Sequence, residues 1–253
     1  MFIEERLEKI LELVHQNRKV TVDEAMGLCN VSADTVRRDF TRLAKNNVVI
    51  RTHGGIMVKT SAMYDSSTSE RRVKNKELKE RIGRRAAELI PDGGTIAVDA
   101  GTTTVELLQY LNTVQNLTLL CYSLDIANEA VKYDQVTTMI LGGIIRNKTS
   151  SVVGPDTAEM VRKLHADVLF LGATAFDSTR GLMTPNRMEA DVKESLISIA
   201  ETVVLLLDSS KIRQRSLFAF CPTENLDIFI TDSETDRGFI EEIAEHGVET
   251  IVV

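Results

Sequence analysis

The sequence predicts an α/β protein in two unequal parts: a small N-terminal helical domain ending in a β-hairpin, then a mostly parallel, helix-covered sheet. A chain of 253 residues is long enough for this division. Charge is segregated, because residues 1–60 hold ten Lys/Arg against eight Asp/Glu, whereas the remainder holds twenty against twenty-nine. From residue 95 onward, short apolar runs alternate with helical segments, which is typical of a parallel sheet covered on both faces.

Bulk composition excludes several protein classes. The first residues are charged where a signal peptide is apolar, and the densest apolar run, 203–207, is too short to span a bilayer. We therefore expect a cytoplasmic protein without membrane segments. Three widely spaced cysteines and four scattered histidines show neither a disulfide framework nor ligand spacing, so we expect no metal and no cofactor.

Three helices are predicted in the first part. Residues 3–16 carry apolar side chains at helical spacing. Thr21 and Glu24 form a capping box that opens a short second helix, which Asn30 ends. Ser32 then caps a third helix running to about residue 45. Two helices joined by so short a turn are typical of a helix-turn-helix, whose second helix enters the DNA major groove.

The third helix has distinct inner and outer faces. At 100° per residue, Val36, Phe40 and Leu43 point inward. Arginine recognises guanine edges or clamps phosphate, and hydroxyls and first-turn amides accept phosphate oxygens. The candidate DNA-binding residues here are Ser32, Thr35, Arg37, Arg38, Thr41 and Arg42. Taken alone, the adjacent Arg37 and Arg38 favour an ordinary solvated face over a DNA-binding one.

The following segment favours DNA binding. Residues 48–51 read as a strand, 52–55 as a turn and 56–58 as a returning strand, which together make a wing. Arg51 and His53 near its tip are candidates for contact with the DNA backbone or minor groove.

The stretch VSADTVRRDFTRL followed by IRTHGG resembles the N-terminal signature of the DeoR-type bacterial transcriptional regulators. The resemblance implies a winged helix-turn-helix over residues 1–58 that binds double-stranded operator DNA as a homo-oligomer. Phe40 and Ile56 depart from the usual residues but remain apolar.

Residues 59–70 are polar and lack apolar periodicity, so we expect an interdomain linker before an α/β domain over 71–253. A helix is predicted from about 71 to 89. The predicted strands are 95–99, 117–121, 136–141, 167–171, 202–207, 216–220, 227–231 and 248–253.

Ligands of such sheets bind beyond the carboxyl ends of the strands, where this chain places polar residues and glycines. The candidate effector-binding residues are Asp99, Gly101, Thr102, Thr103, Thr104, Gly142, Gly143, Arg146, Gly172, Glu189, Asp208 and Lys211. Together they favour a phosphate-bearing ligand. Each also has a simpler explanation as a turn, a cap or, for Glu189 with Lys193, an exposed ion pair along one helix.

The motifs D-x-G-T-T at 99–103, L-G-G at 141–143, E-A-x-V-K at 189–193 and D-x-S-K at 208–211 extend the resemblance to the effector domain of the same regulators. That domain is similar to the ribose-5-phosphate isomerase fold. The resemblance implies that residues 101–104 hold the phosphate of a phosphorylated sugar or polyol, and that Asp99, Glu189, Asp208 and Lys211 line the sugar pocket. Tyr122 stands where the family usually has asparagine.

The leading interpretation is therefore a transcriptional repressor of a carbohydrate-utilisation operon, not an enzyme, working as a dimer or tetramer that a sugar phosphate releases from DNA. The alternative is a sugar-phosphate isomerase with an accessory DNA-binding head, because Asp99, Glu189, Asp208 and Lys211 are chemically able to move a proton beside a carbonyl.

Overall fold

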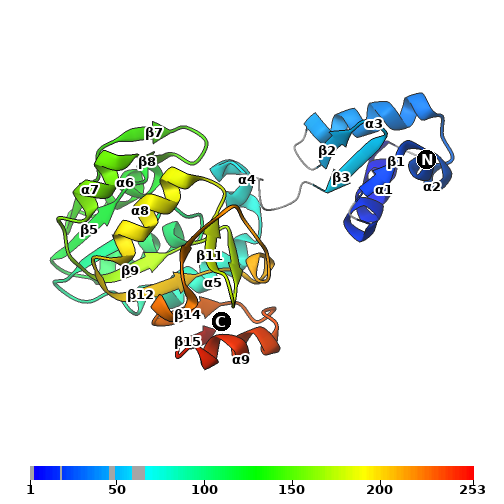
Figure 1. Ribbon diagram of the computed structural model, residues 1–253. Helices are drawn as coiled ribbons and strands as arrows, with labels where there is room; N and C mark the ends of the chain where they lie inside the picture. The colour runs from blue at the N-terminus through cyan, green and yellow to red at the C-terminus, as the bar shows by residue number, and fades with distance from the viewer. Residues whose placement is uncertain (1–2, 18, 46–48, 59–65) are drawn as a thin grey trace. The chain divides into compact units, whose positions relative to one another are not determined.

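The computed structural model describes residues 3–17, 19–45, 49–58 and 66–253. The chain divides into two compact units, Met1–Tyr64 and Asp65–Val253, each of which is described by itself. Figure 1 shows the helices and strands of both units.

The first unit packs three helices against a small antiparallel sheet. The helices are α1 (Ile3–Asn17), α2 (Val22–Cys29) and α3 (Ala33–Lys45), and the strands are β1 (Lys19–Thr21), β2 (Val49–Thr52) and β3 (Gly55–Val58), in the order β1-β3-β2. The three predicted helices and the predicted hairpin are confirmed over the described residues. The strand β1 is an addition, because the sequence signals there only a break between two helices.

Local sequence explains the helix boundaries in this unit. The Thr21–Glu24 capping box begins α2, and Asn30 ends it in the left-handed conformation with φ 52°. Val36, Phe40 and Leu43 of α3 are buried as predicted. They pack with residues of α1, α2 and the sheet in one apolar cluster. The opposite face of α3 therefore points to the solvent.

The wing is a tight hairpin in which Thr52 pairs with Gly55. The strand β3 also pairs with β1, where Thr21 lies opposite Gly55. A Cβ atom on Gly55 would lie 2.1 Å from the carbonyl oxygen of Val20, so only glycine allows this approach.

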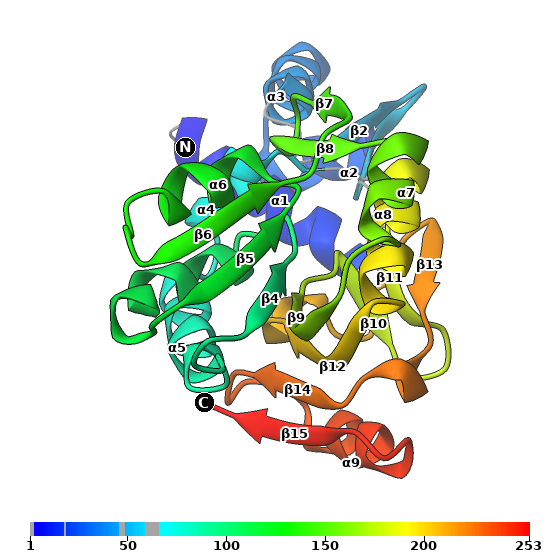
Figure 2. The ribbon, with the colours of Figure 1, turned by 90° about the vertical axis from the view of Figure 1, so that its left-hand side faces the viewer.

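A seven-stranded parallel sheet organises the second unit. Its strands follow the order β15-β14-β12-β9-β4-β5-β6, which Figure 2 shows side by side. Their bounds are β4 (Thr95–Val98), β5 (Leu117–Cys121), β6 (Val136–Ile140), β9 (Ala166–Leu171), β12 (Ala200–Leu206), β14 (Ile228–Thr231) and β15 (Glu249–Val252).

Seven of the eight predicted strands lie in this sheet, and one prediction is wrong. The segment predicted at 216–220 forms β13 (Phe218–Cys221), which belongs to a small antiparallel sheet with β10 (Ala175–Asp177) and β11 (Gly181–Thr184). Periodicity reveals an apolar strand but not its partner. The two-stranded ribbon of β7 (Ile144–Arg146) and β8 (Ser151–Val153) was also not predicted.

Helices cover both faces of the parallel sheet. Buried residues of α5 (Lys76–Ala87), α6 (Leu124–Ala130) and the 3₁₀ helix η2 (Thr104–Thr113) join one core cluster. Those of α7 (Pro155–Val161), α8 (Arg187–Ile197) and α9 (Arg237–Glu245) join another. Along β4, Ile96 and Val98 belong to the first cluster and Ala97 to the second, as the alternation of a strand requires.

The single helix predicted over 71–89 is wrong, because the segment forms two helices. The structure has α4 (Thr68–Val73) before α5, and Asn75 between them is left-handed with φ 54°. The buried amine of Lys79 donates hydrogen bonds to the carbonyls of Arg71 and Lys74, which stabilises the end of α4. Part of the expected linker is therefore helical, because Ser67 caps α4; residues 59–65 lie outside the described residues.

The topology places a switch point between β4 and β9. From β4 the chain proceeds outward through β5 to β6, and then returns to β9 on the other side of β4 before continuing to β12. Loops that leave the carboxyl ends of β4 and β9 therefore diverge, which opens a crevice suited to a ligand.

Within the described residues, no helix is both long and apolar enough to cross a membrane.

A buried ion pair connects α1 to α3 in the first unit. Arg6 Nε lies 2.5 Å from Asp39 Oδ2, and both side chains are almost fully buried. Bonding to Asp39 raises the pKa of Arg6 although burial opposes its charge. We predict that Asp39→Ala destabilises this unit by about 3 kcal/mol, because it removes the carboxylate that forms two hydrogen bonds with a buried guanidinium.

Asp34→Ala is the matched control, because Asp34 pairs with Arg37 on the exposed face of the same helix. Its effect should stay below about 1 kcal/mol. Hydrogen exchange of the α1 and α3 amides in increasing urea measures both variants. Equal losses of protection would contradict the assigned role of the buried pair.

Candidate functional site

The outer face of α3 carries most of the candidate DNA-binding residues. Arg37, Arg38, Thr41 and Arg42 are exposed and, together with Asp34, surround a shallow surface hollow. Arg37 pairs with Asp34 at 3.1 Å. Arg38 and Arg42 are exposed on the face of α3 opposite to the buried Val36 and Phe40.

The hydroxyl groups of α3 serve its local structure. The backbone N–H of Thr35 donates to Ser32 Oγ at 3.4 Å, which confirms Ser32 as the cap. The Thr41 hydroxyl donates to the Arg37 carbonyl at 2.8 Å. An oxygen that caps or donates along its own helix is less available to a phosphate, so the arginines are the stronger candidates of this face.

The wing is tied to α3. Arg51 and His53 are exposed as expected. The Arg51 guanidinium lies 5.7 Å from the centre of the Phe40 ring, within the range of a cation–π interaction. This contact sets the wing against the helix that bears the candidate recognition residues.

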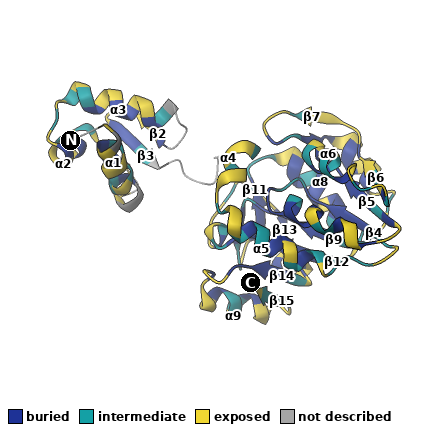
Figure 3. Cartoon of the chain, turned by 180° about the vertical axis from the view of Figure 1, so that it is seen from behind, coloured by how far each residue is buried: buried dark blue, intermediate teal, exposed yellow. Residues whose placement is uncertain are grey.

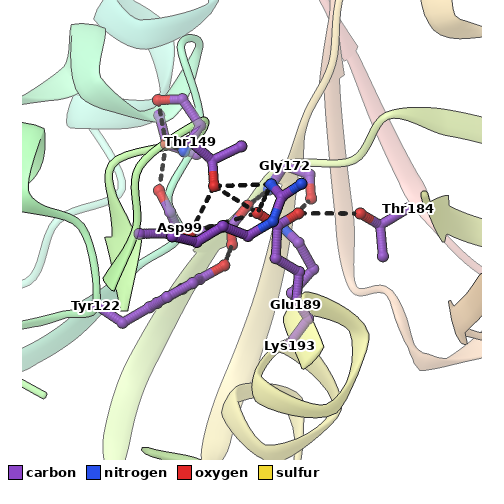
Figure 4. A network of polar contacts seen from close by, with 11 residues as sticks. Asp99, Tyr122, Thr149, Gly172, Thr184, Glu189 and Lys193 are labelled. Atoms are coloured by element: carbon purple, nitrogen blue, oxygen red, sulfur yellow. Dashed lines mark hydrogen bonds and ion pairs between the residues drawn. The ribbon is translucent and has the colours of Figure 1, made fainter. Parts of the chain in front are cut away.

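In the second unit, a narrow polar pocket lies at the carboxyl ends of β4 and β9. Figure 4 shows its polar network. The pocket is lined by Arg71, Asp99, Ala100, Gly101, Thr102, Thr103, Tyr122, Gly172, Ala173, Thr174, Thr184, Glu189, Lys193 and Lys211.

Asp99 is the centre of this network and is almost completely buried. One carboxylate oxygen accepts a hydrogen bond from the Tyr122 hydroxyl. The other accepts from the Lys193 amine and, at 2.9 Å, from the backbone N–H of Gly172. Burial and the neighbouring Asp99 carboxylate raise the pKa of Tyr122 well above its ordinary value, so the phenol is a donor. Asp99 therefore positions its neighbours and has little capacity left for a ligand.

Glu189 forms a second buried centre. Its carboxylate accepts hydrogen bonds from Arg146 at 3.0 Å, Thr149 at 2.8 Å and Thr184 at 3.3 Å. Asn186 caps α8 by accepting from the backbone N–H of Glu189. The exposed Glu189–Lys193 pair considered from the sequence is wrong, because both side chains are buried and Lys193 pairs with Asp99.

In the Gly101–Thr104 loop, one threonine hydroxyl holds the loop together and two others are available to a ligand. The Thr104 hydroxyl donates to the Asp99 carbonyl at 2.6 Å and accepts from the Gly101 N–H at 3.1 Å, so it closes the loop. The hydroxyls of Thr102 and Thr103 are buried and have no hydrogen-bond partner in the described part of the chain. Buried polar atoms without partners are costly, so these two hydroxyls mark the place where a ligand would bind.

Cations gather on the remaining wall. Lys211 lies 3.8 Å from Asp208, whose carboxylate also accepts from Asn75 at 2.9 Å. Burial lowers the pKa of Lys211 to about 8; Asp208 opposes this shift, whereas the positive charges of Arg71, Lys79 and Lys193 add to it. Burial disfavours the charged form of Asp208, but Lys211 and the hydrogen bonds outweigh it and lower the pKa of Asp208. An anionic ligand would relieve the repulsion among these cations.

Some predicted residues lie outside the pocket lining. Gly142 and Gly143 form the turn after β6, where the Gly142 carbonyl accepts from Thr157 at 2.8 Å. A Cβ atom on Gly143 would lie 2.0 Å from the Thr157 hydroxyl, so this glycine is needed for packing. Arg146 acts on the pocket through Glu189, and Asp208 through Lys211. For Gly142 and Gly143, the simpler explanation as a turn is the one that the structure supports.

Sequence reasoning missed five lining residues with functional groups: Arg71, Tyr122, Thr174, Thr184 and Lys193. Tyr122 directly follows β5, so the rule of strand ends would have found it. Lys193 comes from the second turn of α8 and Arg71 from α4, and no local pattern in the chain points either of them toward Asp99.

One further cluster could hold a metal ion. His165, Asp167 and Glu201 bring ligand atoms within 4.8 Å of one another at the opposite, amino-terminal ends of β9 and β12. Asp167 also accepts from the backbone N–H of Thr95 at 2.6 Å. The side chains are at least two-fifths exposed, and surface ion pairing accounts for the arrangement.

The depressed pKa of Lys211 predicts a pH-dependent stability. Below about pH 8 the Lys211 amine is protonated in both the folded and the unfolded chain, so the folded protein bears the full cost of burying a charged amine. Between about 8 and the unfolded value of 10.5, the unfolded chain binds more protons, so the free energy of unfolding rises with pH. The free energy of unfolding of Lys211→Met should therefore exceed that of the wild type by most below pH 8. This difference should shrink as pH rises to 10.5.

Urea denaturation across this pH range measures the difference between the two proteins. Lys163→Met, at an exposed position, is the control and should show no comparable change. A constant difference between Lys211→Met and wild type would contradict the assigned burial.

Two family models match separate segments of the chain. Residues 6–62 match the family described as the DeoR-like helix-turn-helix domain, and residues 74–233 match the DeoR C terminal sensor domain. The HTH-type transcriptional regulator GlpR of Haloferax volcanii is 34% identical over 98% of this chain and 96% of its own length. The glycerol-3-phosphate regulon repressor of Escherichia coli K12 is 28% identical, with 95% of each chain covered.

Among solved structures, a ribose 5-phosphate isomerase from Plasmodium falciparum is similar to part of the chain. The match has a TM-score of 0.40 and 15% identity, and covers 55% of this chain and 53% of that one. The two family matches and the full-length relatives, together with the helix face of α3, establish that the chain belongs to the DeoR family of DNA-binding transcriptional regulators.

Proposed function

We propose that the protein is a cytoplasmic repressor of a carbohydrate-utilisation operon, and that a phosphorylated sugar or polyol in the pocket releases it from operator DNA. The observation that carries this proposal is the pair of buried, unpartnered hydroxyls of Thr102 and Thr103 in the cationic pocket beside Lys211 and Arg71. Hydroxyl donors next to buried cations are suited to a phosphate group. The glycerol-3-phosphate regulon in the name of one relative supports the same ligand class.

The pocket offers separate places for the two ends of such a ligand. Gly101, Thr102 and Thr103 face the phosphate, with Lys211 and Arg71 supplying positive charge. Thr184, also in the lining, is suited to a hydroxyl of the carbon chain, and Glu189 would bind such a hydroxyl by exchanging one of its present donors for it. Asp99 takes an indirect part, because its oxygens already hold Lys193, Tyr122 and Gly172.

The first unit would bind DNA through α3 and the wing. Arg38 and Arg42 are placed to read the major groove, while Arg37, Arg51 and His53 are suited to the phosphate backbone. One recognition helix covers one half-site, so we propose that the protein acts as a homo-oligomer, a dimer or a tetramer, on two half-sites.

The element α4 is placed to transmit ligand binding. It begins with Thr68, shortly after the start of the second unit, and it carries Arg71 of the pocket lining. A phosphate that attracts Arg71 would act on the first helix after the DNA-binding unit. A coupling of about 1 to 3 kcal/mol between ligand and operator is typical of such systems.

An isomerase with an accessory DNA-binding head is not retained. Relatives that cover 95% or more of this chain are named as a transcriptional regulator and a repressor. The two carboxylates nearest the pocket centre, Asp99 and Glu189, are each engaged by three or more donors in the described structure, which suits a positioning role.

For the DNA interface, we predict that Arg38→Ala weakens operator binding by about 1 to 3 kcal/mol and leaves effector affinity unchanged. A duplex selected from a random pool by the wild-type protein serves as the operator in a gel shift. Arg162→Ala, an exposed arginine of the second unit, is the control. Unchanged retention of the duplex by Arg38→Ala would show that this helix face does not read DNA.

For the pocket, we predict that Lys211→Ala binds the same duplex as tightly as wild type but is no longer released by the effector. The effector is first identified from a panel of phosphorylated sugars and polyols by the rise in melting temperature that it causes. Lys163→Ala, at an exposed lysine in the turn after α7, should respond as wild type does. Normal release of Lys211→Ala would remove this residue from the site.

A further inference from the structure

The strand β6 is an edge that nothing in the described chain covers. It is the terminal strand of the parallel sheet and pairs with β5 alone, so its outer backbone groups lack a strand partner. Proteins usually protect such edges with charged residues, proline or a bulge. The residues of β6, Val-Thr-Thr-Met-Ile, include neither charge nor proline, whereas the opposite edge strand β15 begins with Glu249.

Exposed apolar side chains continue from this edge onto the β7–β8 ribbon. Met139 and Ile140 of β6 are 38% and 43% exposed, and Ile144 and Ile145 of β7 are 61% and 53% exposed. Figure 3 shows β7 largely in the colour of exposed residues. Leu124, also exposed, lies beside the ribbon because its N–H donates to Ser150 at 2.8 Å. A run of apolar side chains on an open sheet edge marks an interaction surface.

The chemistry of the surface selects a second copy of this chain as its occupant. Two copies of a chain with a net charge of −7 can meet closely only where like charges are absent, and the uncharged β6 edge can pair with itself. A strand is also the element that satisfies a row of open backbone groups. We propose that β6 pairs antiparallel with β6 of a second copy about a two-fold axis, with Ile145 of the adjoining ribbon packing across it. This rests on the proposed function, in which DNA is read by paired heads.

This surface adjoins the effector pocket. The ribbon that carries Ile144 and Ile145 also carries Arg146, and the loop that follows carries Thr149; both donate to Glu189 of the pocket lining. A ligand that competes for the Glu189 carboxylate would loosen the ribbon at the proposed contact between copies. Ligand binding and pairing of the heads would then share one structural element.

Sedimentation equilibrium of the full chain over a range of concentrations tests the proposal. Ile140→Glu and Ile145→Glu place charge at the proposed contact, and each should weaken self-association at least tenfold. Val252→Glu is the matched control, because Val252 is 47% exposed on the opposite edge strand. Wild-type association in Ile145→Glu, or dissociation by Val252→Glu, would overturn the proposal, provided that each variant retains the wild-type melting temperature.

A cross-linking experiment does not depend on destabilising the contact. Cys29, Cys121 and Cys221 are all buried, so an introduced exposed cysteine is chemically distinct from them. With a bifunctional thiol cross-linker long enough to cover the different possible registers of the β6 pair, Met139→Cys should give a covalent dimer at concentrations where the wild type self-associates, whereas Val252→Cys should not. The reverse pattern, or no dimer from Met139→Cys, would refute pairing through β6.

These outcomes are separable from those of the proposed function. A wild-type protein that stays monomeric while binding the selected duplex would remove the β6 contact and the proposed oligomer, but not DNA binding through α3. A protein that associates through β6 but binds no duplex would remove only the DNA-binding proposal.

Discussion

The second unit depends on keeping the carboxylate of Asp99 buried at the switch point of the sheet. A charge so completely removed from water is tolerated only when it is paired and hydrogen-bonded. Lys193 supplies the opposite charge, Tyr122 a hydroxyl and Gly172 a backbone N–H. These partners come from α8 and from the ends of β5 and β9, so one carboxylate ties together the elements around the pocket.

Because Asp99 is satisfied internally, the groups left over define what the pocket can bind. The hydroxyls of Thr102 and Thr103 have no partner among the described residues, and Lys211 is a largely buried cation with positively charged neighbours. Such a site is preorganised for an anion: binding costs little rearrangement and relieves an existing electrostatic penalty. The same arrangement lets a ligand act on Arg71 of α4 and on the hydrogen bonds of Glu189.

The sequence predicted what local pattern determines. Apolar runs located the parallel strands, and the residues after them located Asp99, Gly101 and Lys211 at the pocket. The buried face of α3 followed from helical periodicity in the same way. Pairings between distant segments were not predictable: Lys193 reaches Asp99 across 94 positions, and β13 looks like any other strand until its antiparallel partner β11 is known. The uninterrupted helix failed because left-handed Asn75 has no unique signature in the chain.

In the proposed function, ligand binding in the pocket of the second unit and DNA binding by the first unit are energetically coupled. If the effector weakens operator binding by a certain factor, thermodynamic linkage requires that operator DNA weaken effector binding by the same factor. The effector must therefore bind the operator-bound protein more weakly than the free protein. Titration of the effector into free protein and into protein saturated with the selected duplex measures both affinities. The account predicts a reduction of roughly 5- to 150-fold on DNA, matched by the loss in operator affinity. Equal effector affinity in the two states would contradict it.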